Sequence, residues 1–332
     1  MIKIILKFIF AAGVIAWLVN SGKLDFKLIG KLLNHKDTLF ISWIFLLIPV
    51  FISTYRWKKI LEIKTKCSLK FFDILRVNWI GFLFSSILPG AVTGDLIKLV
   101  YVRDLNKSLS KSFLLLSILM DRVLGLIGLL FLMGTFSILN YQEITAISPL
   151  LKKMIHFNFL IFLGVLLFLI YLFLPTKLQS KILNFSTKIP LVGGKLHRLL
   201  EQFWLIGSHK KVVLISVTIS IFAQSSAIFA FWNLASPFFD KPLSFIHSIT
   251  FMPLGFVAIA IPISPAGLGV GHAIFDKLFG FFGVSGGASL FNLYWITYVS
   301  NNLLGIIPYT LNKKKHSLDE TDEFEVPQPN EV

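Results

Sequence analysis

Hydrophobic residues run along this chain in long, nearly continuous stretches separated by short polar segments. A helix needs about 20 apolar residues to cross about 30 Å of hydrocarbon. Six stretches satisfy that length, at about residues 2–20, 39–56, 113–139, 157–174, 212–235 and 288–309. They lack the alternation typical of a membrane β-barrel. An unpaired backbone polar group in lipid is strongly unfavourable, so the pattern predicts six transmembrane helices.

Two further apolar stretches, residues 71–97 and 245–282, are interrupted midway by proline and glycine. The interrupting residues are Pro89, Gly90, Gly94, Pro262, Pro265, Gly267 and Gly269. Proline removes a backbone donor and clashes with the preceding helical turn, whereas glycine adds backbone freedom. Irregular backbone at membrane depth is tolerated only inside the protein or beside a wet cavity. We predict a re-entrant hairpin of two half-helices at each stretch, the alternative being two kinked helices.

Paired, interrupted segments in two halves of a membrane protein are typical of inverted-repeat transporters, whose binding site lies between them. The expected fold is therefore an all-α polytopic membrane protein, with six full transmembrane helices and two re-entrant hairpins in an inverted repeat. Residues 1–312 form this domain. Residues 313–332 carry three lysines and then six acidic residues, and they are expected to form a disordered cytoplasmic tail.

Charge gives the expected orientation. The 332-residue chain is 55% hydrophobic and 15% charged, with a formal net charge of +15. Its basic residues flank the apolar stretches, which indicates retention on the cytoplasmic side and argues against nucleic-acid binding. With the N-terminus cytoplasmic and each hairpin returning to its own side, the cytoplasmic segments hold 22 lysines and arginines and the outer segments hold 7. We therefore expect a cytoplasmic-membrane protein with both termini in the cytoplasm.

The basic segment 175–211 is partly amphipathic. It is expected either to lie on the anionic inner leaflet or to form a solvated loop. Cys67 is the only cysteine, so an internal disulfide and a CxxC metal site are excluded.

Ionisable residues within apolar stretches are the candidate functional residues, because each costs at least about 2.5–3.5 kcal/mol at mid-membrane. They are Arg76, Asp95, Lys98, Asp121, Arg122, His272 and Asp276. Arginine and lysine bind phosphate, and half-helix N-termini add N–H donors. The pattern predicts a cationic pocket for an anionic headgroup, with acids orienting the cations. Purely structural ion pairs are the alternative.

His272 has a separate expected role. It lies one turn after the second break, on the same helix face as Asp276. Titration near neutral pH would make transport proton-sensitive, and the alternative is a bond to neighbouring backbone only. No metal, cofactor or catalytic residue is expected, because two ligands are too few and the glycines at 267, 269 and 271 follow no strand of a βαβ unit.

Residues 87–98 (ILPGAVTGDLIK) followed by 121–126 (DRVLGL) resemble the first motif of the lysylphosphatidylglycerol synthase transmembrane-region family. Residues 262–270 (PISPAGLGV) are similar to its second motif, and the resemblance covers most of 1–312. It implies movement of anionic or lipid-linked headgroups across the inner membrane. Lys98 stands where arginine is usual and His272 where an acid is usual. No aminoacyl-transfer domain follows residue 312, so lipid aminoacylation is not expected.

The expected function is thus flipping of an anionic phospholipid or lipid-linked envelope precursor, without enzymatic activity. Two alternatives stay open. A membrane-embedded, isoprenoid-linked glycosyltransferase would need acids at a membrane face, and a scaffold would bind envelope-synthesis enzymes.

Overall fold

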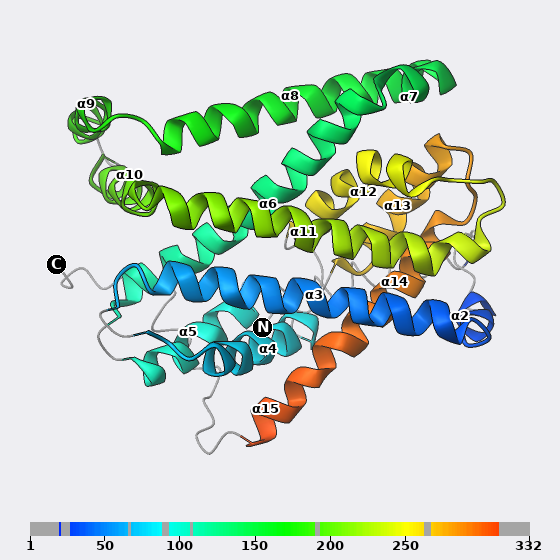
Figure 1. Cartoon of the computed structure of the whole chain (residues 1–332), viewed down its shortest axis with the longest axis horizontal. Helices are drawn as coiled ribbons and strands as arrows, with labels where there is room; N and C mark the ends of the chain where they lie inside the picture. The colour runs from blue at the N-terminus through cyan, green and yellow to red at the C-terminus, as the bar shows by residue number, and fades with distance from the viewer. Residues whose placement is uncertain are drawn as a thin grey trace.

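The computed structural model describes residue 20 and residues 27–65, 68–87, 93–106, 109–189, 193–261 and 267–311. Residues 2–19 of the predicted first span, the tail 313–332, and Pro89, Gly90, Pro262 and Pro265 at the two breaks lie outside the described residues. Within those ranges the regular structure is helical throughout (Figure 1). The elements are α2 (Lys27–Leu32), α3 (Lys36–Leu61), α4 (Phe71–Ile87), α5 (Thr93–Leu105), α6 (Lys111–Leu139), α7 (Tyr141–Ile147), α8 (Pro149–Leu172), α9 (Thr176–Ser186), α10 (Gly193–Ser208), α11 (Lys210–Ala235), the 3₁₀ turn η1 (Ser236–Phe238), α12 (Phe245–Ala260), α13 (Val270–Phe281), α14 (Gly287–Asn302), the 3₁₀ turn η3 (Leu303–Gly305) and α15 (Ile306–Leu311).

Four elements, α3, α6, α8 and α11 continued by η1, are long and apolar enough to cross a membrane. They confirm four of the predicted stretches as long apolar helices. α8 begins eight residues before the predicted start at 157, because Ser148 caps it. The Ser148 hydroxyl accepts the Leu151 N–H at 3.2 Å, and Pro149 occupies the first turn, where its missing donor costs nothing.

The predicted single span 288–309 is wrong in one respect, because it is not one regular helix. α14 ends at Asn302, and η3 separates it from α15. Gly305, in η3, lies so close to the backbone carbonyl of Trp79 on α4 that an added Cβ would clash with it. The irregular turn therefore coincides with close contact between the end of α14 and α4.

α4 and α5 form an antiparallel helix pair joined by residues 88–92. Gly94, at the start of α5, lies directly on the carbonyl of Gly81 and on Ser85, near the end of α4. Further along the pair, the Lys98 ammonium donates to Asn78 Oδ1 at 3.2 Å. The stretch predicted to break is therefore two helices, and the second continues to Leu105.

Gly94→Ala is expected to lower the free energy of unfolding by about 1–3 kcal/mol, because its methyl group would push α4 and α5 apart. Thermal unfolding in detergent measures this effect. Gly164→Ala on α8 is the control, since nothing lies within 4 Å of its added Cβ. That change should leave stability unchanged or raise it by up to about 1 kcal/mol through helix propensity. Equal melting temperatures for the two variants would contradict the close α4–α5 contact.

α12 and α13 form a second antiparallel pair. The Phe251 and Phe279 rings lie 5.3 Å apart, and Gly255 leaves room for the Phe275 ring. Beyond the outer ends of the pair, Asp240 accepts the Ser285 hydroxyl at 2.6 Å and its N–H at 3.1 Å. These hydrogen bonds lower the pKa of Asp240. A continuous helix from 255 to 280 is absent, since α12 ends at Ala260 and α13 begins at Val270.

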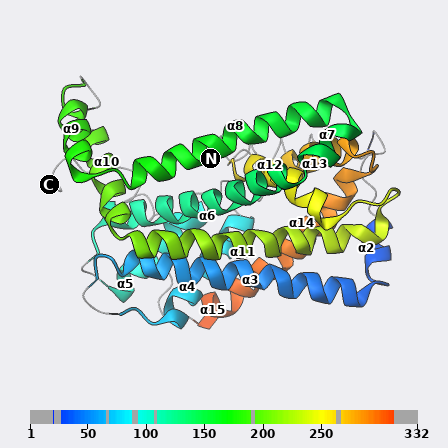
Figure 2. The same ribbon diagram turned by 45° about the horizontal axis from the view of Figure 1, so that its top comes forward.

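The two helix pairs enter the molecule from opposite ends. One end, here called the basic end, is marked by a cluster of buried residues: Ile60, Leu116, Leu172, Ile206 and Val213. The opposite end is marked by another: Ile144, Leu151, Leu243, Val284 and Leu290. α5, α9 and α10 gather at the basic end, and α2, α7, α12 and α13 lie toward the other (Figures 1 and 2).

α3 and α11 each contain 26 residues and lie antiparallel. Asn233 Nδ2 donates to the Thr38 carbonyl at 3.1 Å, and the Ser226 hydroxyl donates to the Phe45 carbonyl at 2.6 Å. Each of these two helices is followed by a helix pair and then by α6 or α14. The order of elements is therefore the same in the two halves.

Side-chain packing in the first half centres on Lys98. Its stem lies on Gly81, where an added Cβ would clash with it. Its Nζ lies 5.1 Å from the centroid of the Trp57 ring and 5.5 Å from that of Phe82.

Phe275 repeats these contacts in the second half. Its ring lies on Gly255, with centroids 4.9 Å from Phe231 and 5.9 Å from Phe256. Each of these three partners stands 174 positions after its counterpart in the first half. The two halves therefore share a packing arrangement, with an aromatic ring in one where the other has an ammonium group.

Candidate functional site

Asp95 is the centre of an ionic cluster, here called the Asp95 cluster, formed with Lys98 and Arg122. Asp95 lies in the first turn of α5 and is itself buried. Arg122, on α6, donates from Nε to Asp95 Oδ2 at 2.5 Å and also pairs with that oxygen through Nη2. The Lys98 ammonium lies 2.7 Å from Asp95 Oδ1. Three residues predicted from their position in apolar sequence are thus brought together.

The Lys98 ammonium is enclosed by protein. Its side chain is 7% exposed, and besides Asp95 it binds Asn78 Oδ1. Asn78 in turn donates to Thr54 Oγ1 on α3 at 3.0 Å. The Trp57 ring faces the same ammonium, so a carboxylate, an amide oxygen and an aromatic ring replace its water. This environment fits a fixed counter-ion for Asp95.

Arg122 is the accessible cation of the Asp95 cluster. Its side chain is 42% exposed, compared with 9% for Asp95. Tyr298, on α14, is half-buried and lies within electrostatic range of both charges. Two cations and one carboxylate leave the cluster with a formal charge of +1. Chemically, the arrangement can hold an anion against Arg122 while Lys98 keeps Asp95 in place.

Asp121 precedes Arg122 in the sequence but belongs to a different contact. Its Oδ1 accepts Arg56 Nε at 2.6 Å, and Arg56 Nη1 donates to Ser220 Oγ at 2.6 Å. This Arg56–Asp121–Ser220 contact joins α3, α6 and α11. Gly125, one turn after Asp121, leaves room for the guanidinium, since an added Cβ would lie 3.1 Å from Nη1.

Arg56 is not among the residues that the sequence identifies as candidates, because it stands among the basic residues that flank the spans. It stands at the last position of the predicted span 39–56. That position was the available signal, since a cation there can reach either water or a buried carboxylate.

Arg76 lies apart from the Asp95 cluster. Its side chain is 71% exposed, and Nη1 lies 3.9 Å from Asp73 on the same helix. The α4 face that contacts α5 carries Asn78 and Gly81 instead.

His272 is buried and bonded through both ring nitrogens. Nδ1 accepts the Gly269 N–H at 3.3 Å, and Nε2 lies 3.3 Å from Asn292 Oδ1 on α14. Gly269 has a φ of 81°, which glycine readily adopts. Protonation would place a second N–H against that of Gly269, so the geometry fits the neutral ring. The partners of His272 lie next to α13 and on α14, whereas those of Asp95 lie on α5 and α6. The pairing of His272 with Asp276 stays a prediction.

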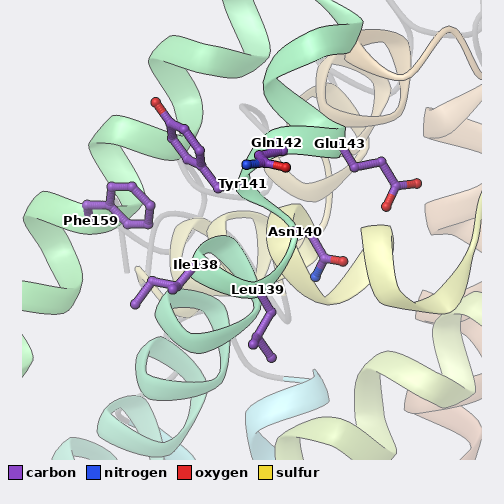
Figure 3. A pocket seen from close by; sticks show the side chains of 7 residues that line it. All are labelled: Ile138, Leu139, Asn140, Tyr141, Gln142, Glu143 and Phe159. Atoms are coloured by element: carbon purple, nitrogen blue, oxygen red, sulfur yellow. The ribbon is translucent and has the colours of Figure 1, made fainter.

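A surface hollow of about 700 Å³ lies at the C-terminal end of α6, away from the Asp95 cluster. Its lining residues are Ile138, Leu139, Asn140, Tyr141, Gln142, Glu143 and Phe159. Tyr141 and Phe159 lie on one side and Glu143 on the other (Figure 3). The hollow begins 16 residues after Arg122, about 24 Å along a helix, and holds no member of the Asp95 cluster. Across the described parts of the chain, no group of three His, Cys, Asp or Glu side chains could hold a metal ion.

Comparison with protein families matches residues 4–303 to one described as the lysylphosphatidylglycerol synthase TM region. The match contains both helix pairs, the Asp95 cluster and the Arg56–Asp121–Ser220 contact. A search of curated proteins gives no match.

Proposed function

The chain belongs to the lysylphosphatidylglycerol synthase transmembrane-region family, and on that premise we propose that it flips an anionic phospholipid or a lipid-linked envelope precursor across the cytoplasmic membrane. The family and the apolar helices make it a multi-pass membrane protein. The proposed activity is transport rather than catalysis, with a lipid headgroup as the ligand and envelope-synthesis enzymes as neighbours.

One observation carries this proposal: Arg122 is half-exposed and is held by a buried carboxylate at the start of a helix. A lone arginine within a bilayer costs at least about 2.5–3.5 kcal/mol, and Asp95 offsets that cost while no ligand is bound. A headgroup phosphate offers the planar arginine fork the same kind of oxygen acceptors. The phosphate would therefore replace Asp95 as the partner of Arg122, while the ion pair with Lys98 keeps Asp95 in place.

We further propose that α4–α5 and α12–α13 are re-entrant hairpins among six full spans, related as an inverted repeat. The opposite entry of the two pairs and the repeated packing around Lys98 and Phe275 support this arrangement. Movement of one half against the other would then open the site to each side in turn, as in other inverted-repeat transporters.

Reconstitution tests the activity directly. Purified protein in liposomes should accelerate the loss of headgroup-labelled phosphatidylglycerol from the outer leaflet, or that of a labelled isoprenoid-linked sugar. Native mass spectrometry of the purified protein should retain an anionic lipid. Release of a new glycolipid would instead identify a glycosyltransferase. Failure to flip either class of anionic lipid, with the protein folded, would contradict the proposal and favour a scaffold.

Topology gives a separate prediction. Single cysteines at 64, 107 and 188, in a Cys67→Ser background, should resist an impermeant thiol reagent added outside intact cells. Cysteines at 153 and 241 should react. The reason is the bias of basic residues toward the basic end, where Lys64 lies 5.1 Å from the Phe113 ring at the start of α6. Labelling at 64 and 188 but not at 153 and 241 would mean the opposite orientation.

A further inference from the structure

α9 and α10 lie across the end of the transmembrane bundle. They connect the end of α8 at Leu172 to the start of α11 at Lys210. In Figure 1 both are seen nearly end-on while α8 and α11 run lengthwise, and in Figure 2 they again cross those helices. Because α8 and α11 are long and apolar enough to cross a membrane, two helices that cross their ends would run parallel to the membrane surface.

Contacts of α10 fix the position of α9 and α10 relative to the end of α8. The buried Trp204 donates from its indole N–H to the Tyr171 carbonyl, in the last turns of α8, at 3.0 Å. Gly207 lies against the Leu172 carbonyl, so that an added Cβ would clash. A ring nitrogen of His197, on α10, lies 3.2 Å from the Leu183 carbonyl of α9. α9 is thereby held close to the end of α8.

α9 is amphipathic, and the described parts of the chain leave two of the three positions on its apolar face uncovered. Leu178, Ile182 and Phe185 follow the i, i+4, i+7 spacing of one helix face. The side chains of Leu178 and Phe185 are 45% and 67% exposed. Two exposed lysines, Lys177 and Lys181, lie together on one flank of that face, and the exposed Lys188 follows two residues after the helix ends.

We propose that α9 is a recognition surface for an anionic lipid leaflet, with its apolar face among the acyl chains and with Lys177, Lys181 and the following Lys188 among the headgroups. Charge supports this occupant, because a row of lysines beside an exposed aromatic face suits phosphate-bearing lipids. Its orientation along the membrane surface supports it independently. The surface is distinct from the Asp95 cluster and does not depend on flipping.

Site-directed spin labelling tests this surface without any transport assay. Single cysteines at 185 and 184, in the Cys67→Ser background, would be labelled and reconstituted in phosphatidylcholine with or without phosphatidylglycerol. The position 185 label should be accessible to oxygen and shielded from a water-soluble nickel chelate. The label at 184, an exposed polar neighbour on the other side of the lysines, should show the reverse.

Anionic recognition has its own readout. Phosphatidylglycerol should deepen the position 185 label, and Lys177→Gln/Lys181→Gln/Lys188→Gln should abolish that shift while the 184 label stays in water. Equal nickel accessibility at 184 and 185 would overturn the proposal in favour of a solvated segment. Shielding of the 185 label from oxygen as well as from the nickel chelate would indicate a protein partner and overturn the proposal too. A depth independent of phosphatidylglycerol would remove the anionic recognition.

Discussion

Arg122→Lys is expected to reduce flipping almost as much as Arg122→Ala, by about ten- to hundredfold. The Arg122 fork meets Asp95 Oδ2 through both Nε and Nη2, a geometry that a lysine cannot reproduce. A hydrogen bond to a charged group contributes about 1.5–3 kcal/mol, and each 1.4 kcal/mol is a factor of ten. The initial rate of headgroup-labelled lipid flipping in liposomes measures the loss.

Arg76→Ala is the matched control, because it removes an arginine from α4 that faces away from the Asp95 cluster. Its flipping rate should stay close to that of the parent. Wild-type flipping by Arg122→Ala, at the same reconstituted yield and melting temperature, would show that Arg122 is not a headgroup ligand.

Arg56→Ala should produce the largest loss of stability among single changes to the ion pairs described above, about 3–5 kcal/mol. The reason is that Asp121 would keep its charge with its partner removed, while both side chains are largely buried. The Ser220 hydroxyl would lose its donor in the same step. Thermal unfolding in detergent, followed by tryptophan fluorescence, is the measurement.

The double variant Arg56→Met/Asp121→Leu should recover most of that stability, because an apolar pair leaves no charge behind. Lys59→Ala, which removes a more exposed partner of Glu62 at the end of the same helix, is the control and should change stability by less than about 1 kcal/mol. If Arg56→Ala has the same melting temperature as Lys59→Ala, the Arg56–Asp121 pair contributes little to the stability of the fold.

Helices α3, α6 and α11 could be predicted closely because each is a long apolar run bounded by charged residues. The two broken stretches could be predicted because proline and glycine change the backbone locally. The internal turn after Asn302 could not be predicted, since Gly305 is the only residue in the turn whose type suggests an irregular backbone. It depends on the approach of the Trp79 carbonyl to Gly305, a contact between residues more than 200 positions apart.

The Asp95 cluster could be predicted in outline because charges in apolar sequence need partners. The identity of the partners could not. Asp121 and Arg122 are neighbours in sequence, which suggested a shared site. Successive residues of an α-helix point about 100° apart, so one side chain reaches α3 and the other reaches α5. The position of Arg76 outside the cluster could not be predicted either, because its apolar neighbours do not indicate which helix face is covered.

The pairing of charges has a consequence for how the nascent chain enters the membrane. Asp95 and Lys98 stand one turn apart on α5, and Asp121 and Arg122 are adjacent on α6. Each segment leaving the ribosome therefore carries its own neutralising charge before any other helix is present, which lowers the cost of its insertion. Asp121 can pair with Arg56, and Arg122 with Asp95, only later, when α3, α5 and α6 meet. Insertion as locally neutral segments would thus precede the formation of the ion pairs between helices that lock α3, α5 and α6 together.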